Sequence, residues 1–284
     1  MTCIPSTAYS RDLGDELRRL RETHTKFTGR WMGHLVGWDQ SKISNVENGK
    51  VRASEIDLVQ YLTACGKDRE FIDDFLNRYR NAFDSYFVQV PENLRTMSMA
   101  EATANKITGF YMVAIPGLLQ TEDYARELFR CRNGVPLDKI ERAVRFRMDR
   151  QAILQRHDRP ACTFFVHELA LRMRVGGHRL MEEQYCRLMH HTHSIRIVPL
   201  SSGPAGALNA SYVLWQYEKA NPVAFSESDL AKVFAQDEAA INRCKAIFER
   251  LDTVALGEGQ SRSLLTDLVS RSREGLNATG LRLA

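Results

Sequence analysis

The chain has 284 residues, of which 44% are hydrophobic and 26% are charged, and its formal net charge is +4. This balance excludes a disordered chain and a fibrous repeat, and the length suggests two domains. No stretch approaches the roughly 18 uncharged apolar residues that a membrane helix needs. Residues 1–9 lack the basic run and apolar core of a signal peptide, so we expect a cytoplasmic protein without membrane contact.

The cysteines give no sign of a disulfide or zinc framework, because none of them forms a Cys-x-x-Cys pair. Without a secretory signal, we expect free and mostly buried thiols in a reducing compartment. The cysteines are Cys3, Cys65, Cys131, Cys162, Cys186 and Cys244.

Residues 10–83 are predicted to be nearly all helix, in short segments separated by glycines and capping residues. In residues 10–22, Leu13, Leu17 and Leu20 recur at spacings of four and three, which predicts one buried stripe. The polar face of this helix carries Arg11, Arg18, Arg19 and Arg21.

A second helix is predicted to begin at the N-cap Thr28 and to end at Gly37. We expect Met32, Leu35 and Val36 to face inward in this helix.

After a short turn, Asp39 is a suitable N-cap for a third helix over residues 40–47. Ile43 and Val46 form its inward pair, and Gly49 closes it in the left-handed region.

A fourth helix is predicted over residues 54–65, opened by a capping box at Ser54 and terminated by Gly66. Its inward residues are predicted to be Ile56, Val59 and Leu62.

Two short helices joined by a tight, glycine-containing turn are typical of a helix-turn-helix. A recognition helix brings side chains within hydrogen-bond reach of base edges in the major groove. Gln suits adenine, Lys suits guanine, and Ser and Asn are general polar partners. The predicted base-reading residues are Gln40, Ser41, Lys42, Ser44 and Asn45. The predicted contacts to the DNA backbone come from Arg18, Thr28, Arg30, Lys50 and Arg52. The alternative is a helical bundle that serves as a protein-interaction module.

Residues 10–66 resemble the helix-turn-helix of the Xre/Cro/lambda-repressor class, chiefly through the pattern Ser-x-x-Ser-x-x-Glu-x-Gly within residues 38–50. The resemblance implies a structural role for Glu47. Proteins of this docking class bind as dimers to two half-sites, so we expect a homodimer on a palindromic double-stranded operator. Family members commonly carry a phosphate-binding Gln where this chain has Gly29, and Arg30 is the candidate replacement.

The helical pattern breaks at residues 86–94, where Pro91 lacks a backbone N–H and disfavours helix at the residue before it. We therefore expect a DNA-binding domain over residues 1–90 and a second domain over residues 91–284. Strand candidates lie at 110–114, 161–166, 195–199, 211–217 and 222–226, and helix candidates at 121–132, 136–157, 178–192, 236–253 and 260–272. The predicted fold is mainly α, with a mixed α/β (α+β) second domain after the helical bundle. The tail from Gly275 is expected to be frayed.

Residues 114–126 contain the run Pro-Gly-Leu-Leu-Gln-Thr, with Thr121 placed to start a helix. Together with residues 150–154, 167–172 and 175–177, this run resembles an actinobacterial, Streptomyces-like family in which an Xre-type helix-turn-helix precedes a C-terminal domain. The resemblance implies an antitoxin-like regulator that is frequently encoded beside a small partner protein.

The sequence therefore predicts a sequence-specific DNA-binding transcriptional regulator. Its activity would be modulated by a small protein partner or ligand that binds the C-terminal domain. The C-terminal domain would also contribute to dimerisation. The alternative is an antitoxin-like module that mainly sequesters a small cognate protein and autoregulates its operon. A third class, an enzyme with a DNA-targeting domain, is the least favoured.

Three groups in the second domain could carry chemistry. An adjacent His and Glu at a strand end point apart, so they do not form an acid–base pair. Histidines one or two positions apart on a helix do not face one another, so they do not form a metal site. A glycine pair without a longer motif forms no phosphate-binding loop. We therefore predict no enzyme activity, no cofactor and no metal site. The groups are His167 with Glu168, the histidines His190, His191 and His193, and the pair Gly176 and Gly177. An alternating aromatic set is either core or cavity lining, namely Phe164, Phe165, Tyr212, Trp215 and Tyr217.

Charge is unevenly distributed along the chain. Residues 1–53 hold nine basic and six acidic side chains (net +3), and residues 54–90 hold four and seven (net −3). Residues 126–159 hold ten basic and five acidic side chains, which fits a solvated helical face, an acidic partner surface or additional DNA backbone contact. The modest total excludes a histone-like blanket binder and fits a few placed phosphate contacts.

Overall fold

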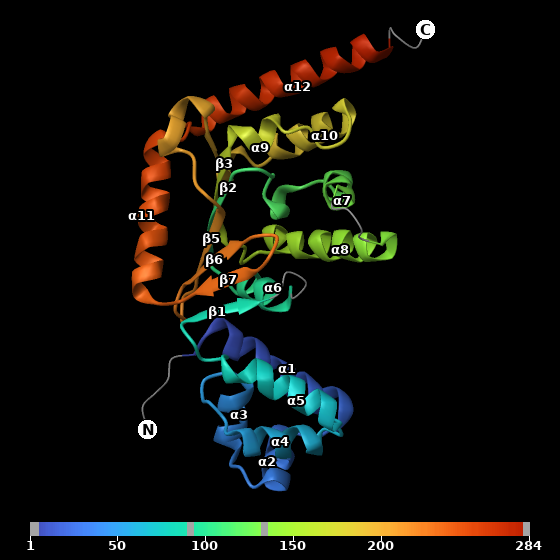
Figure 1. The fold of residues 1–284 in the computed structure, drawn as a ribbon, viewed down its shortest axis with the longest axis vertical. Helices are drawn as coiled ribbons and strands as arrows, with labels where there is room; N and C mark the ends of the chain where they lie inside the picture. Colours follow the sequence, from blue (N-terminus) through green and yellow to red (C-terminus); the bar gives the residue numbers. More distant parts are fainter. Residues whose placement is uncertain (1–5, 90–93, 132–135, 281–284) are drawn as a thin grey trace. The chain divides into compact units, whose positions relative to one another are not determined.

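A computed structural model describes residues 6–89, 94–131 and 136–280 (Figure 1). Its helices and strands form two compact units. The first comprises Met1–Thr103, Tyr217–Val223 and Ser228–Ile241, and the second comprises Ala104–Gln216, Ala224–Glu227 and Asn242–Ala284. The predicted fold class is confirmed, because a helical N-terminal region is followed by a domain with a mixed sheet and helices. The domain boundary at residues 90 and 91 stays a prediction.

The first unit is mainly helical. Its helices are α1 (Ala8–His24), α2 (Gly29–Val36), α3 (Gln40–Glu47), α4 (Glu55–Ala64), α5 (Arg69–Arg80) and α6 (Arg95–Ala102), and its antiparallel strands are β1 (Tyr86–Gln89) and β7 (Lys232–Ala235). Leu13, Leu17 and Phe75 are fully buried in its core. Phe87 of β1 lies opposite Phe234 of β7, and their stacked rings have centroids 4.5 Å apart.

A buried polar cluster ties α1 to α6. The Thr96 hydroxyl donates to Asp12 Oδ2 at 2.6 Å, and Arg95 Nε lies 2.5 Å from Asp12 Oδ1. Arg95 also pairs with Asp15 at 3.0 Å. Burial raises the pKa of Asp12, although Thr96 and Arg95 favour its charged form. The contact between the two helices is therefore an ion pair in which the Asp12 carboxylate is buried and the Arg95 guanidinium is partly exposed.

The second unit is built on a mixed sheet. Its strands are β2 (Lys106–Tyr111), β3 (Ala161–His167), β4 (Ile195–Val198), β5 (Ser211–Gln216) and β6 (Val223–Glu227), in the order β6-β5-β2-β3-β4. Strand β3 is parallel to β2 and to β4, whereas β5 is antiparallel to β2. In this register, Gly109 of β2 lies between Phe164 of β3 and Val213 of β5.

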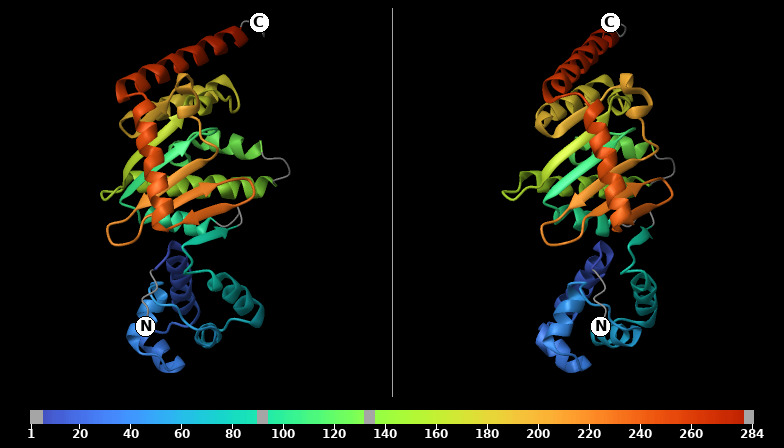
Figure 2. Two further views of the ribbon diagram at one scale, coloured as in Figure 1. Left: turned by 60° about the vertical axis from the view of Figure 1, so that its left-hand side comes forward. Right: turned by 90° about the vertical axis from the view of Figure 1, so that its left-hand side faces the viewer.

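Helices cover both faces of this sheet. They are α7 (Glu122–Arg130), α8 (Leu137–Arg150), α9 (Glu168–Arg172), α10 (His178–Met189), α11 (Glu238–Val254) and α12 (Glu258–Gly280), with 3₁₀ turns η1 (Gly117–Leu119), η2 (Gln151–Gln155), η3 (Thr192–Ser194) and η4 (Leu200–Ala205). Helix α11 lies across one face, and α7, α8 and α10 lie on the other (Figures 1 and 2). Phe165 stacks on Phe248 of α11 with centroids 6.0 Å apart. Phe164, Phe165 and Trp215 are buried, so the aromatic set belongs mainly to the core.

Several predicted boundaries need correction. Each predicted strand overlaps an observed one, but the strand predicted at 110–114 is β2, which ends at Tyr111. The break predicted at 86–94 contains β1, whose partner β7 comes much later in the chain. The prediction of a frayed tail from Gly275 was wrong, because helix α12 continues to Gly280. One interior glycine costs a helix only about 1 kcal/mol, which is too little to end it.

The described cysteines are free thiols, and Cys3 lies outside the described residues. Cys65 and Cys244 are buried, and burial raises the pKa of each thiol to about 11. Cys131 is exposed, so the expectation of mostly buried thiols holds only in part. Across the described ranges, none of the helices has the length and apolar character to cross a membrane.

Candidate nucleic-acid interface

The turn between α2 and α3 is set by local capping. Gly37 ends α2 with φ at 71°, in the left-handed region. The Asp39 carboxylate accepts a hydrogen bond from the backbone N–H of Lys42 at 2.7 Å, and Thr28 Oγ1 accepts one from Trp31 at 3.2 Å. The predicted caps of both helices are therefore confirmed, and they fix where α3 begins.

Glycines let the backbone of α3 approach α1 and α2 closely. A Cβ on Gly14 of α1 would lie 2.7 Å from the carbonyl oxygens of Val46 and Glu47, and one on Gly33 of α2 would meet the turn backbone at 2.6 Å. Gly49 follows α3 with φ at 64°, as predicted. The position of α3 is thus fixed by direct backbone contact.

A buried ion pair anchors the C-terminal end of α3. Glu47 accepts hydrogen bonds from Arg21 Nε at 2.7 Å, from Arg21 Nη2 at 2.9 Å and from the Tyr61 hydroxyl at 2.7 Å. Burial acts to raise the pKa of Glu47, but these hydrogen bonds and the charges of Arg21 and Arg18 outweigh it and lower the pKa. The structural role expected of Glu47 is confirmed. The placement of Arg21 on the polar face was wrong, because its guanidinium turns inward to neutralise Glu47.

The predicted base-reading residues differ in how they are placed. Gln40, Ser41 and Ser44 are exposed on α3. Asn45 is half-buried, and its amide donates to Ser41 Oγ at 3.3 Å. Three short or medium polar side chains therefore face solvent from one rigid helix.

Lys42 is instead held against α4. Its Nζ donates to Asp57 Oδ1 at 2.9 Å and lies 4.3 Å from the centroid of the Trp38 ring. The indole N–H of Trp38 donates to the same carboxylate oxygen at 3.0 Å. Burial acts to raise the pKa of Asp57, but hydrogen bonds from Lys42 and Ser54 outweigh it and lower the pKa. Lys42 can reach a base edge only by leaving this pair.

The predicted backbone-contacting residues surround α3. Those that are exposed are Thr28, Arg30, Lys50 and Arg52. Arg52 donates to the carbonyl oxygen of Arg80 at 2.8 Å, whereas the side chains of Arg30 and Lys50 make no hydrogen bond or ion pair with any described residue. Arg18 is half-buried and donates to Asn48 Oδ1 at 2.6 Å. Arg30 and Lys50 are therefore the cations most available to an anionic partner.

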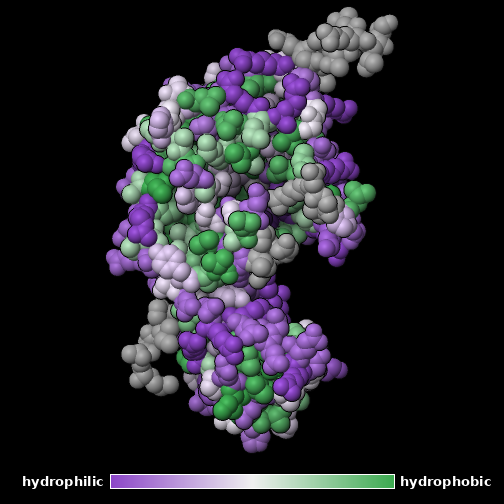
Figure 3. Space-filling view, in the orientation of Figure 1, coloured by the Kyte–Doolittle hydropathy of each residue, from purple (hydrophilic) through white to green (hydrophobic). Residues whose placement is uncertain are grey.

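Three residues that were predicted to face inward on α2 and α4 are exposed instead. Leu35 and Ile56 are 55% and 73% exposed, and Val59 is exposed as well. Helix α4 buries Leu58 and Tyr61 instead. The inward assignment of Leu35, Ile56 and Val59 was wrong, because apolar residues on both faces of a short helix leave its rotation undetermined. Figure 3 shows hydrophobic side chains gathered over α2 and α4.

A groove of about 480 Å³ lies between α2 and the start of α3. Trp31 and His34 lie in it, although neither was predicted as a site residue. The i,i+4 spacing of Arg30 and His34 places both on one face of α2, and this spacing is the signal that could have found the groove. The lining residues are Thr28, Arg30, Trp31, His34, Trp38 and Gln40.

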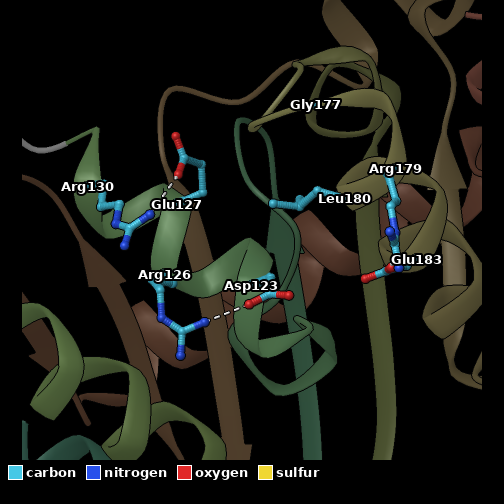
Figure 4. Close-up of a pocket in the computed structure, with 8 residues that line it drawn as sticks. All are labelled: Asp123, Arg126, Glu127, Arg130, Gly177, Arg179, Leu180 and Glu183. Atoms are coloured by element: carbon cyan, nitrogen blue, oxygen red, sulfur yellow. Dashed lines mark hydrogen bonds and ion pairs between the residues drawn. The ribbon is translucent and has the colours of Figure 1, made fainter. Parts of the chain in front are cut away.

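The second unit has a cavity of about 400 Å³ between α7 and α10 (Figure 4). Arg130 pairs with Glu127 at 3.8 Å, Arg179 pairs with Glu183 at 3.2 Å, and Arg126 is paired along α7. Each arginine of the lining thus has a carboxylate beside it, and the cavity offers little net charge to a ligand. The lining residues are Asp123, Arg126, Glu127, Arg130, Gly177, Arg179, Leu180 and Glu183.

The Pro-Gly-Leu-Leu-Gln run forms the turn η1, which buried side-chain amides hold in place. Gln120 Nε2 donates to the Ile115 carbonyl at 2.7 Å, Gln151 Nε2 donates to the Gln120 carbonyl at 2.8 Å, and Gln184 Nε2 donates to the Leu119 carbonyl at 2.9 Å. These amides satisfy the backbone of an irregular buried segment. The geometry of the run is that of a structural turn.

Family comparisons cover both parts of the chain. A model described as a domain of unknown function (DUF5753) matches residues 94–267. The chain belongs to the DUF5753 family. A model described as a helix-turn-helix domain matches residues 12–75, which suggests a DNA-binding regulator. Comparisons with curated proteins and with solved structures found no match.

The DUF5753 match begins inside the first unit. It includes α6, whose Arg95 and Thr96 hold Asp12 of α1. It also includes Tyr217, whose ring lies 5.4 Å from the guanidinium of Arg11 on α1. The first helix of the helix-turn-helix is therefore packed against parts of the DUF5753 region.

The acid–base candidates of the DUF5753 region are engaged in the fold. His167 Nδ1 accepts a hydrogen bond from the backbone of Leu169 at 3.2 Å, and burial lowers the pKa of its imidazole. Glu168 accepts from the backbone N–H of Leu200 at 2.8 Å and pairs with Arg172 at 2.6 Å. Within the described part of the chain, no group of three or more His, Cys, Asp or Glu side chains could hold a metal ion.

Proposed function

We propose that the protein is a sequence-specific DNA-binding transcriptional regulator of the Xre type, with α3 as its recognition helix. The observation that carries the proposal is the exposed polar face formed by Gln40, Ser41 and Ser44. This face lies on a helix whose far end is anchored by the Glu47–Arg21 pair. A rigid helix with short polar side chains suits the reading of base edges.

In this proposal, the polar side chains of α3 bind different base edges. Gln40 bonds an adenine edge, and Ser41, Ser44 and Asn45 are general polar partners. Lys42 bonds a guanine edge after leaving its ion pair. Because that exchange opposes binding, Lys42 contributes less to affinity than a free lysine would.

The DNA backbone is held by residues around α3. Arg30 and Lys50 are exposed and have no competing side-chain partner among the described residues, so they bind phosphates at the lowest cost. Thr28, the N-cap of α2, adds an exposed hydroxyl at the positive end of that helix. Arg18 and Arg52 exchange their present acceptors for phosphate oxygens.

The DUF5753 region is proposed to control DNA binding. The protein acts as a homodimer on a palindromic operator, with half-sites roughly 34–36 Å apart, and this region contributes the dimer contact. A small protein or ligand that binds the region changes the packing of α6 on α1. The buried Asp12–Arg95 pair supports this route, since α1 in turn contacts α3 through Gly14. We propose no catalytic step.

Selection from a random duplex library with the full-length protein tests the proposal. The expected result is one palindromic consensus. On that operator, fluorescence anisotropy is expected to show that Gln40→Ala weakens binding by about 5- to 150-fold and leaves an unrelated duplex unaffected. Gln60→Ala is the matched control, because Gln60 is exposed on α4. An equal loss on both duplexes would reassign Gln40 to the backbone, and the absence of any consensus would contradict the proposal.

A further inference from the structure

The groove between α2 and α3 combines an exposed indole with hydrogen-bond donors. Trp31 is 56% exposed, and its ring centroid lies 6.2 Å from that of His34. Among the described residues, neither Arg30 nor His34 has a side-chain hydrogen bond or ion pair. The groove therefore holds donors that are not engaged by other described residues, beside an apolar surface.

The lining of the groove favours a negatively charged occupant. Arg30 contributes a cation, and the N-terminal end of α2 contributes the positive end of a helix dipole. No carboxylate lines the groove. By contrast, the cavity between α7 and α10 holds Asp123, Glu127 and Glu183, which neutralise its arginines. An anion is thus stabilised in the groove of the first unit and gains little in the second.

Gln40 indicates which anion fits. It is the first residue of α3, it lines the groove, and it belongs to the proposed base-reading set. An occupant of the groove therefore lies next to the bases that α3 reads. A DNA strand offers phosphates for Arg30 and His34 and the apolar edge of a deoxyribose for Trp31.

We propose that Trp31 packs on a deoxyribose of the DNA backbone while Arg30 and His34 donate hydrogen bonds to the flanking phosphates. The groove seats one stretch of strand and so sets the angle at which α3 enters the major groove. This inference rests on the proposed function of α3 and adds Trp31 and His34 to the interface.

The intrinsic fluorescence of Trp31 provides a direct test on the full-length protein. The other tryptophans, Trp38 and Trp215, are 8% and 1% exposed, so acrylamide quenching reports mainly on Trp31. Both the selected operator and an unrelated duplex are expected to reduce the quenching, because a backbone contact does not depend on sequence. Unchanged quenching at saturating duplex would overturn the inference.

Substitutions test the energetic role of the indole. Trp31→Ala is expected to weaken binding of both duplexes by a similar factor of about ten, and Trp31→Phe is expected to restore most of it. Arg30→Ala should reduce the salt slope by about one. Leu35→Ala is the matched control, because Leu35 is exposed on the same helix and does not line the groove.

The two proposals fail in distinguishable ways. If α3 does not read DNA, the library selection with wild-type protein yields no operator. If the groove does not seat the backbone, the wild type selects an operator but Trp31→Ala and Leu35→Ala bind it equally well. Quenching that falls with rising protein concentration in the absence of DNA would show a second copy in the groove and overturn the assignment.

Discussion

Glu47 carries a negative charge into the core at the end of α3, and Arg21 supplies the matching positive charge. Glu47→Gln leaves that guanidinium without its anion, so we expect a loss of about 3–5 kcal/mol in the free energy of unfolding at neutral pH. Urea denaturation followed by circular dichroism measures it. A loss below about 1 kcal/mol would show that the pair contributes little net stability.

The same pair has a predictable pH dependence. The pKa of Glu47 is lower when folded than the unfolded value of about 4.3, so its stabilisation is complete above that value and is lost as pH falls through the folded pKa. The difference between wild type and Glu47→Gln should therefore shrink below about pH 4. The pKa of Asp12 is raised, so its contribution to the free energy of unfolding changes with pH in the opposite direction. Asp12 is present in both proteins, and its contribution therefore cancels in the difference.

Lys42 is a single residue with two competing partners. If it leaves Asp57 to read guanine, Asp57→Asn releases the lysine and removes a negative charge near DNA, so operator affinity should rise several-fold while Lys42→Ala lowers it. Each change should cost less than about 1 kcal/mol of stability, because the pair is partly exposed. Unaltered affinity in both variants, measured by anisotropy, would assign Lys42 to the fold alone.

At the scale of elements, α3 is positioned by close backbone contact with α1 in addition to its buried side chains. Gly14→Ala places a Cβ 2.7 Å from two carbonyl oxygens, so we expect α3 to shift, stability to fall by about 1–3 kcal/mol and operator affinity to fall with it. Gly29→Ala is the control, since its Cβ would meet only the Ile43 side chain at 3.4 Å. Thermal unfolding and anisotropy of both variants decide the matter, and equal behaviour would count against the close contact.

Capping residues and the buried stripes of α1 and α3 could be predicted from the sequence, whereas the rotation of α4 could not. Thr28, Asp39 and Gly37 act through neighbours a few positions away, so their local pattern was sufficient. Ile56 and Val59 were misplaced because α4 carries apolar residues on both faces, and the packing of α2 and α5 against it selects one. The exposure of Gln40, Ser41 and Ser44 was predicted for the same local reason as the caps.

At the scale of the whole molecule, the partners of α1 come from distant parts of the chain. The pairing of Phe87 with Phe234 depends on contact between segments that no local pattern connects. The diversion of Lys42 to Asp57 and the groove at Trp31 likewise arise from neighbouring helices. The diversion of Lys42 and the pairing of Phe87 with Phe234 could not be read from spacing, whereas the strands and helices of the DUF5753 region largely could.

A truncation tests whether the helical bundle is self-sufficient. A fragment of residues 1–90 lacks Arg95 and Thr96, which hold the buried Asp12, whereas a fragment of residues 1–103 retains them. Both fragments lack Gln236, which accepts from the backbone N–H of Ala8 at 3.0 Å, so the comparison reports on α6 alone. We expect the fragment of residues 1–90 to unfold at lower urea than the fragment of residues 1–103 and to bind operator more weakly. Equal stability and affinity of the two fragments would show that the bundle does not need α6.

The composition of the first unit has a consequence for biosynthesis. Because Tyr217–Val223 and Ser228–Ile241 belong to that unit, its packing is finished only after these late segments have left the ribosome. A nascent chain that has already exposed residues 12–75 therefore lacks part of the support of α1. Full affinity for an operator is therefore expected only after translation has passed residue 241, which links the activity of the regulator to synthesis of the DUF5753 region.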